Sequence, residues 1–113
     1  MTIQIFGKKK CFDTKKAERF FKERGVKYQR VDILDKGLSK GELRSVVSSL
    51  GSLEALLDEE AKEYAMIKYL VASQREEKLL DTPSVYKTPI VRNGKKATIG
   101  YAPETWKAWL ASS

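Results

Sequence analysis

The stretch that decides the fold is T-I-Q-I-F-G-K-K-K-C-F, residues 2–12. Residues 2–6 form a strand-like run of Thr, Ile, Gln, Ile and Phe, and Gly7 with three lysines then leads the chain into a helix. Cys11 lies at this junction and is the only cysteine among 113 residues, which include no histidine. Because unpaired N–H groups at a helix start and nearby lysines favour a thiolate, the junction predicts a reactive sulfur.

The next segment predicts the rest of a βαβ unit. Apolar residues spaced at i, i+3 and i+4 indicate an amphipathic helix from about residue 11 to Arg24, ended by Gly25. Val26–Ile33 is rich in β-branched and aromatic residues and predicts a second strand. The two strands should be parallel, with a right-handed crossover.

A helical block follows at about residues 39–81. Ser39 and Glu42 have the spacing of a capping box and begin a helix. After a break, apolar residues keep helical spacing over residues 53–71, and Arg75–Leu80 predicts one more short helix. We therefore expect these residues to form an insert between the two halves of the sheet.

The chain then returns to strand. Two β-prone runs, residues 89–92 and 96–99, flank Asn93-Gly94, which predicts a hairpin with a type I′ turn. Pro103 begins a C-terminal helix. Its two tryptophans and one leucine share a face, so we expect them to pack in the core rather than to stack on a ligand.

The order of elements is β-α-β, helical insert, β-β-α. It predicts an α/β protein with a thioredoxin-like fold and a four-stranded mixed sheet, in a single domain over residues 1–113. No linker or repeat divides the chain. Cys11 at the first strand-to-helix junction and Thr88-Pro89 before the third strand sharpen this prediction among small α/β folds.

Composition narrows the classes of function. Twenty-two Lys and Arg against fifteen Asp and Glu give a net charge of +7, which attracts anions. These charges are scattered, as on a solvated surface, and are not interleaved with aromatics, so direct binding of nucleic acid is not expected. No run is long and apolar enough to span a membrane and no secretory signal opens the chain, so we expect a cytoplasmic protein.

Among the common catalytic chemistries, the residue types of this chain allow thiol chemistry or no catalysis. Without histidine a Cys-His pair is excluded, and we expect no metal site and no bound cofactor, since the nucleotide-phosphate loops are absent too. One alternative is a Cys11 that is only a small buried hydrophobe. In the reactive interpretation, Thr14 donates a hydrogen bond to the sulfur, whereas Asp13 opposes the thiolate if it points there. The positive potential would come from Lys8, Lys9, Lys10 and Lys15, although the first three also suit a solvated turn.

Several motifs together resemble the arsenate reductase-related (ArsC/Spx-like) family, which contains glutathione/glutaredoxin-linked arsenate reductases and Spx-type transcriptional regulators. The resemblance runs the length of the chain. It implies that Pro89 is a cis-proline facing Cys11 and that Thr88 and Pro89 shape the substrate site. The motifs are Gly7-x-x-x-Cys11-x-x-Thr14-Lys15, Thr88-Pro89-Ile90-Val91 and Ile99-Gly100-Tyr101-x-Pro103-Glu104-x-Trp106.

The resemblance also implies departures from the reductases, in which a C-x-x-S-R motif and three further arginines bind the oxyanion. Lys15 replaces the motif arginine, and Asp58, Thr88 and Ala102 replace the other three. A lysine lacks the planar fork of an arginine. We therefore expect monothiol redox chemistry with glutathione as co-substrate and glutaredoxin as a partner, rather than efficient arsenate reduction.

The regulators of this family commonly carry C-x-x-C, but Thr14 stands in place of the second cysteine. An internal disulfide is therefore excluded, and a redox response would need an external thiol. Binding to the α subunit of RNA polymerase does not require that second cysteine. A transcriptional regulator and a catalytically silent relative are the two alternatives to a redox protein.

Overall fold

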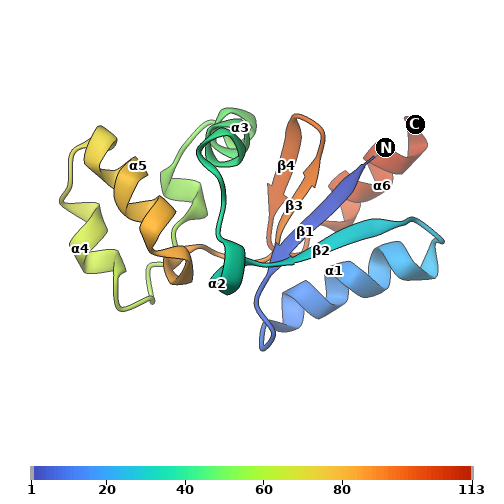
Figure 1. Cartoon of the computed structure of the whole chain (residues 1–113). Coiled ribbons are helices and arrows are strands. Elements are labelled where there is room, and N and C mark those ends of the chain that lie inside the picture. The colour runs from blue at the N-terminus through green and yellow to red at the C-terminus, as the bar shows by residue number, and fades with distance from the viewer. Residues whose placement is uncertain (1, 113) are drawn as a thin grey trace.

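The computed structural model describes residues 2–112. Its centre is a four-stranded mixed sheet in the order β2-β1-β3-β4 (Figure 1). The first two strands are parallel, and the other neighbouring pairs are antiparallel. This arrangement confirms the predicted thioredoxin-like order. The strands are β1 (Ile3–Gly7), β2 (Tyr28–Asp32), β3 (Ile90–Asn93) and β4 (Lys96–Ile99).

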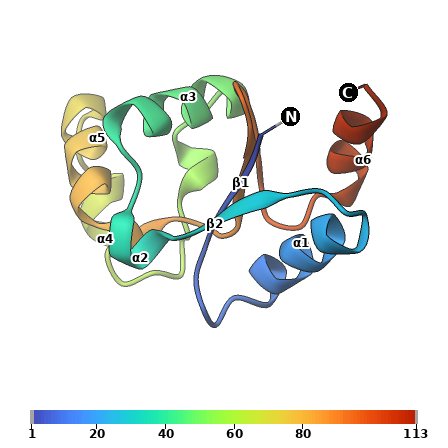
Figure 2. The ribbon, with the colours of Figure 1, turned by 45° about the vertical axis from the view of Figure 1, so that its right-hand side comes forward.

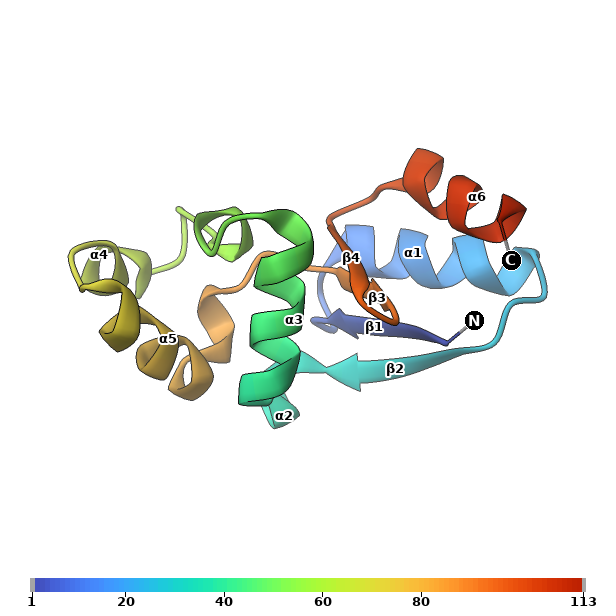
Figure 3. The same cartoon turned by 90° about the horizontal axis from the view of Figure 1, so that it is seen from above.

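One face of the sheet is covered by α1 (Phe12–Glu23) and α6 (Pro103–Ala111), which lie side by side (Figure 3). The tryptophans pack in the core between these helices and the sheet, as predicted, and Trp106 Nε1 donates to the Thr98 hydroxyl at 2.8 Å. This first core consists of Ile3, Ile5, Ala17, Phe20, Phe21, Val91, Trp106 and Trp109.

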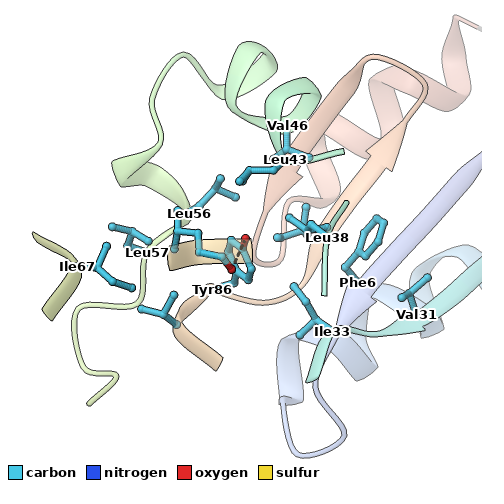
Figure 4. Close-up of a cluster of buried hydrophobic side chains, with 13 residues drawn as sticks. Phe6, Val31, Ile33, Leu38, Leu43, Val46, Leu56, Leu57, Ile67 and Tyr86 are labelled. Carbon is cyan, nitrogen blue, oxygen red and sulfur yellow. Dashed lines mark hydrogen bonds between the residues drawn. The ribbon is translucent and has the colours of Figure 1, made fainter. Parts of the chain in front are cut away.

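A second core lies between the sheet and the helical insert. Side chains alternate along a strand, so Phe6 faces the insert while Ile5 faces α1 and α6. Figure 4 shows Phe6 beside Leu38 and the line of apolar side chains that continues from there into the insert. The buried residues are Phe6, Val31, Ile33, Leu38, Leu43, Val46, Leu56, Leu57, Ile67, Leu79, Val85, Tyr86 and Ile90.

The insert extends away from the sheet on the side opposite α1 and α6 (Figure 2). Its first long helix begins with the predicted capping box: Ser39 Oγ accepts from Glu42 N, and Glu42 Oε1 accepts from Ser39 N. The helices are α2 (Ile33–Lys36), α3 (Lys40–Leu50), α4 (Tyr64–Lys68) and α5 (Ala72–Asp81), with short 3-10 turns at Glu54–Leu56 and Pro83–Val85. No helix in residues 2–112 has the length and apolar composition to cross a membrane.

Two predicted elements are wrong in extent. The second strand begins at Tyr28, two residues later than predicted, and ends at Asp32, whose carboxylate accepts from Leu34 N and so begins α2 at Ile33. Residues 53–71 do not form a continuous helix, because only Glu54–Leu56 and α4 are helical there. The short helix predicted over Arg75–Leu80 is confirmed and begins earlier, at Ala72.

The hairpin is confirmed, but its turn is not of the predicted type. Asn93 pairs with Lys96, so Gly94 and Lys95 are the two loop residues. A type I′ turn needs positive φ at both loop residues, whereas only Gly94, at 61°, has one. Positive φ at the first loop residue alone is typical of a type II′ turn, for which glycine is favoured.

Candidate functional site

Cys11 lies at the end of the loop that joins β1 to α1. It is the N-cap residue of α1: its N–H donates to Lys8 O at 3.1 Å, and its carbonyl accepts from Lys15 N at 3.3 Å. The side chain is half-buried and its thiol is free. It reaches a cavity of about 630 Å³ lined by Lys8, Cys11, Asp13, Ala55, Asp58, Tyr86, Lys87, Thr88, Ile99 and Gly100.

The segment before β3 closes the other side of the sulfur. Cys11 Sγ donates to the carbonyl oxygen of Thr88 at 3.5 Å. The Thr88–Pro89 peptide bond is cis, as the resemblance implied. Pro89 also joins the start of β3 to the residue after β4, because its carbonyl accepts from Gly100 N at 2.8 Å. Thr88, which lies far from Cys11 in sequence, thus belongs to the same site.

Two opposing effects set the acidity of this thiol. Burial, the largest single effect, raises the pKa of Cys11, but hydrogen-bond donors around the sulfur together bring that pKa below its ordinary value. The donors are the side chains of Thr14 and Thr88 and the backbone N–H groups of Thr14 and Asp13. Hydrogen bonds to a thiolate stabilise its charge, so the site favours the nucleophilic form of the sulfur.

Thr14 is held for this role by its packing. Its side chain is almost completely buried, and its hydroxyl has no hydrogen-bond partner among residues 2–112, which leaves it available to donate to a thiolate at Cys11. The backbone of Gly7 presses against it: a Cβ added to Gly7 would lie 2.2 Å from Thr14 Cγ2. Gly7, at the end of β1, is therefore needed for the close approach of its backbone to the Thr14 side chain.

The four predicted lysines occupy different places. Lys8 lines the cavity, but its Nζ donates to the carbonyls of Ser84 at 2.9 Å and Tyr86 at 3.1 Å. Lys9 and Lys10 are exposed and do not line the cavity. Lys15 does not line the cavity either, and its ammonium lies over the ring of Phe12. The sequence interpretation missed Lys87, which lines the cavity and whose only sequence signal is its place next to Thr88-Pro89.

These features can be compared with known proteins. The sequence profile of the ArsC family matches residues 6–109. The chain belongs to the ArsC family.

Proteins similar to this ArsC-family chain include a transcriptional regulator and an arsenate reductase. The global transcriptional regulator Spx 2 of Oceanobacillus iheyensis is 25% identical, in an alignment that covers 97% of this chain and 84% of the regulator. A Bacteroides fragilis protein described as ArsC family related superposes with a TM-score of 0.82 at 18% identity, covering 96% of this chain and 97% of that one. An arsenate reductase from Vibrio cholerae gives 0.81 at 21% identity, covering 93% and 94%. At these identities the two structures show a shared fold.

The cavity of this ArsC-family chain presents both signs of charge. Asp58 belongs to the insert and lines the cavity, and its Oδ1 accepts from Glu60 N at 3.0 Å. Asp13 lines the cavity from α1 and lies 4.0 Å from Lys16 Nζ. Within residues 2–112, no arginine lines the cavity and no three His, Cys, Asp or Glu gather where they could hold a metal. The site therefore offers a thiolate and hydrogen-bond donors, without a bidentate clamp for a tetrahedral oxyanion.

Proposed function

We propose that this chain is a monothiol redox protein that exchanges disulfides with glutathione through Cys11. The observation that carries the proposal is the half-buried Cys11 that lines the cavity, whose pKa is lowered by hydrogen-bond donors despite burial. A thiol of lowered pKa is ionised near neutral pH to a larger extent and attacks disulfides in that form. Cys11 is the nucleophile, and Thr14 and Thr88 stabilise its charge.

The reaction has two exchange steps. The Cys11 thiolate attacks the glutathione sulfur of a mixed disulfide, so a Cys11–glutathione bond forms and the other thiol leaves as a thiolate. A second glutathione thiolate, free or delivered by glutaredoxin, then attacks the glutathione sulfur attached to Cys11. Glutathione disulfide forms and Cys11 returns as a thiolate. The net reaction consumes one glutathione thiolate for each mixed disulfide and yields one free thiolate and one glutathione disulfide.

The charges in the cavity favour a glutathione-containing disulfide over arsenate as the substrate. Arsenate carries its charge on a compact oxyanion, which the carboxylates of Asp13 and Asp58 repel. Of the two lysines that line the cavity within residues 2–112, Lys8 is held by two backbone carbonyls, which leaves Lys87 alone against the two carboxylates. Glutathione carries an amino group as well as carboxylates, so a cavity with Lys87 and Asp58 offers partners for both signs.

The test follows formation and removal of the adduct. Incubation of the reduced protein with glutathione disulfide should add one glutathione, read by intact-protein mass spectrometry, and glutathione with glutaredoxin should remove it. Thr14→Val should slow formation about ten-fold at neutral pH because the thiolate loses a donor, whereas Thr105→Val on the exposed side of α6 should not. No adduct, or an adduct that glutaredoxin leaves in place, would contradict the proposal, as would arsenate turnover that exceeds the exchange rate.

A second candidate is a transcriptional regulator that acts through the α subunit of RNA polymerase. The similarity to Spx 2 over 97% of this chain favours it. The two candidates separate in a capture experiment with purified RNA polymerase and the Cys11→Ser variant. Capture by both wild type and Cys11→Ser supports the regulator, and an absence of capture by wild type excludes it.

A further inference from the structure

A groove is lined by residues of α1 and α6 and of the loop before α6. These two helices lie side by side, on the side of the sheet away from the insert (Figure 3). We call this groove the α1–α6 groove. Its volume is about 440 Å³, and four basic side chains and one acidic side chain line it. The lining residues are Lys16, Arg19, Phe20, Glu23, Arg24, Tyr101, Pro103 and Lys107. The excess of positive charge in one concave place makes it a candidate site for an anionic partner.

Two of these cations are held in place by aromatic rings. The Arg24 guanidinium lies 3.8 Å from the centroid of the Phe20 ring, and its Nη1 donates to the Phe20 carbonyl at 3.1 Å. Lys16 Nζ lies 5.5 Å from the centroid of the Tyr101 ring. Long basic side chains that are already ordered lose less entropy when they bind a partner. The groove is therefore partly pre-organised for carboxylates.

The ion pairs already present leave the groove open to a partner. Lys107 Nζ lies 3.7 Å from Glu104, and Lys16 Nζ lies 4.0 Å from Asp13, in both cases between solvent-exposed groups. Pairs of this kind contribute little and exchange readily for other carboxylates. Arg19 is exposed and forms no ion pair with any residue of the described chain.

We propose that the α1–α6 groove binds an extended acidic peptide segment of a partner protein. The backbone positions of Lys16 and Arg24 are separated by about 12 Å along the helix axis, a distance that about four extended residues span. Single-stranded nucleic acid needs successive exposed rings to stack on. The groove offers only Tyr101, half-exposed, because Phe20 is buried.

The α1–α6 groove lies beside the Cys11 cavity. The loop after β4 separates the two sites: Gly100 lines the Cys11 cavity, and Tyr101 lines the groove. Asp13 of the cavity and Lys16 of the groove are likewise paired across the start of α1. A partner held by an acidic segment would therefore lie next to the sulfur.

The test is a binding titration with a fluorescein-labelled peptide of alternating Glu and Ala, about ten residues long. It uses the Cys11→Ser chain, so the result is independent of redox activity. The double variant Arg19→Glu/Lys107→Glu should weaken binding at least about ten-fold and reduce its salt dependence, because charged partners in the rim are lost. The matched control is Lys95→Glu/Lys96→Glu, which changes the net charge equally on the exposed β3–β4 hairpin. It should bind as the parent does.

Two results would overturn the proposal. Equal weakening by the groove and hairpin variants would mean that the peptide responds to overall charge alone. Tighter binding of an oligothymidylate of matched length, lost in the same groove variant, would assign the groove to nucleic acid instead. The double variant Arg19→Gln/Lys107→Gln removes the two positive charges without introducing negative ones at these exposed positions. Its loss of peptide affinity should therefore lie between those of the parent and of the Glu variant.

Discussion

At the scale of single residues, the chemistry of Cys11 depends on two neighbours that approach it closely. The buried Thr14 hydroxyl, unpaired among residues 2–112, lowers the pKa of Cys11 by stabilising its thiolate, and Gly7 leaves the space that Thr14 occupies. Gly7 is needed here for the absence of a side chain, since a Cβ would collide with Thr14. The residue that ends the first strand thereby controls the donor that stabilises the thiolate.

Gly7→Ala should therefore lower the free energy of unfolding by about 1–3 kcal/mol, the usual cost of overpacking a buried site. Urea denaturation measures this change. A second substitution, Thr14→Ala, removes the atoms nearest to the added methyl and should recover part of the loss. Gly41→Ala in α3 is the matched control, because its Cβ would meet nothing within 4 Å. A Gly7→Ala chain as stable as wild type would show that the contact with Thr14 is not tight.

At the scale of elements, the site is assembled from three parts of the chain that are distant in sequence. The β1–α1 loop supplies Cys11, the segment before β3 supplies Thr88, and the insert supplies Asp58. Lys8 joins two of these parts, because its ammonium holds the carbonyls of Ser84 and Tyr86. Its function in this account is structural.

Lys8→Met keeps most of the side-chain length but loses both charge-assisted hydrogen bonds. It should lower the free energy of unfolding by about 1–3 kcal/mol, measured in urea. Lys9→Met, next to it on the exposed turn, should change stability by less than about 0.5 kcal/mol. Equal effects of the two substitutions would contradict the structural role of Lys8.

The elements were predictable where periodicity or a local motif specifies them. The capping box at Ser39 and the Cys11 junction follow from a few neighbouring residues. Contacts between distant segments leave no such signal: nothing in the run of three lysines distinguishes Lys8, which is tied to Tyr86, from the exposed lysines after it. The turn type depends on the register of the hairpin, and the observed register differs by one residue from the predicted one. Gly94 rather than Asn93 therefore stands at the first loop position.

At the scale of the whole molecule, the sheet separates two cores with different neighbours. The α1 and α6 side holds the tryptophans, and the insert side holds Tyr86, which lines the Cys11 cavity and packs among the insert helices. The Tyr86 hydroxyl donates to the Leu79 carbonyl at 3.0 Å in the interior. Burial raises the pKa of Tyr86, so the folded protein holds this phenol in its neutral form.

The raised pKa of Tyr86 makes the stability of the whole chain depend on alkaline pH. In the unfolded chain Tyr86 ionises near pH 10, whereas in the folded chain it stays neutral to higher pH. The stability that Tyr86 contributes is therefore complete below about pH 10 and is lost as pH rises further. Tyr86→Phe should lower stability by about 1 kcal/mol at neutral pH through the lost hydrogen bond, with the difference shrinking above about pH 10. Urea denaturation across pH measures this.

The control for that comparison is Tyr69→Phe, since Tyr69 is exposed. Its stability should follow the wild-type profile across the alkaline range. A difference between wild type and Tyr86→Phe that stays constant with pH would contradict the account of Tyr86.

The most direct test of the central claim is the pH dependence of Cys11 alkylation by iodoacetamide, which reacts with the thiolate. The only cysteine of the sequence gives an unambiguous signal. Because the hydrogen-bond donors outweigh burial, the rate in the folded protein should reach half its maximum at a lower pH than in the same chain unfolded in urea. Thr14→Val should move the folded midpoint upward and Thr105→Val should not. A folded midpoint equal to or above the unfolded one would contradict a thiolate nucleophile at Cys11.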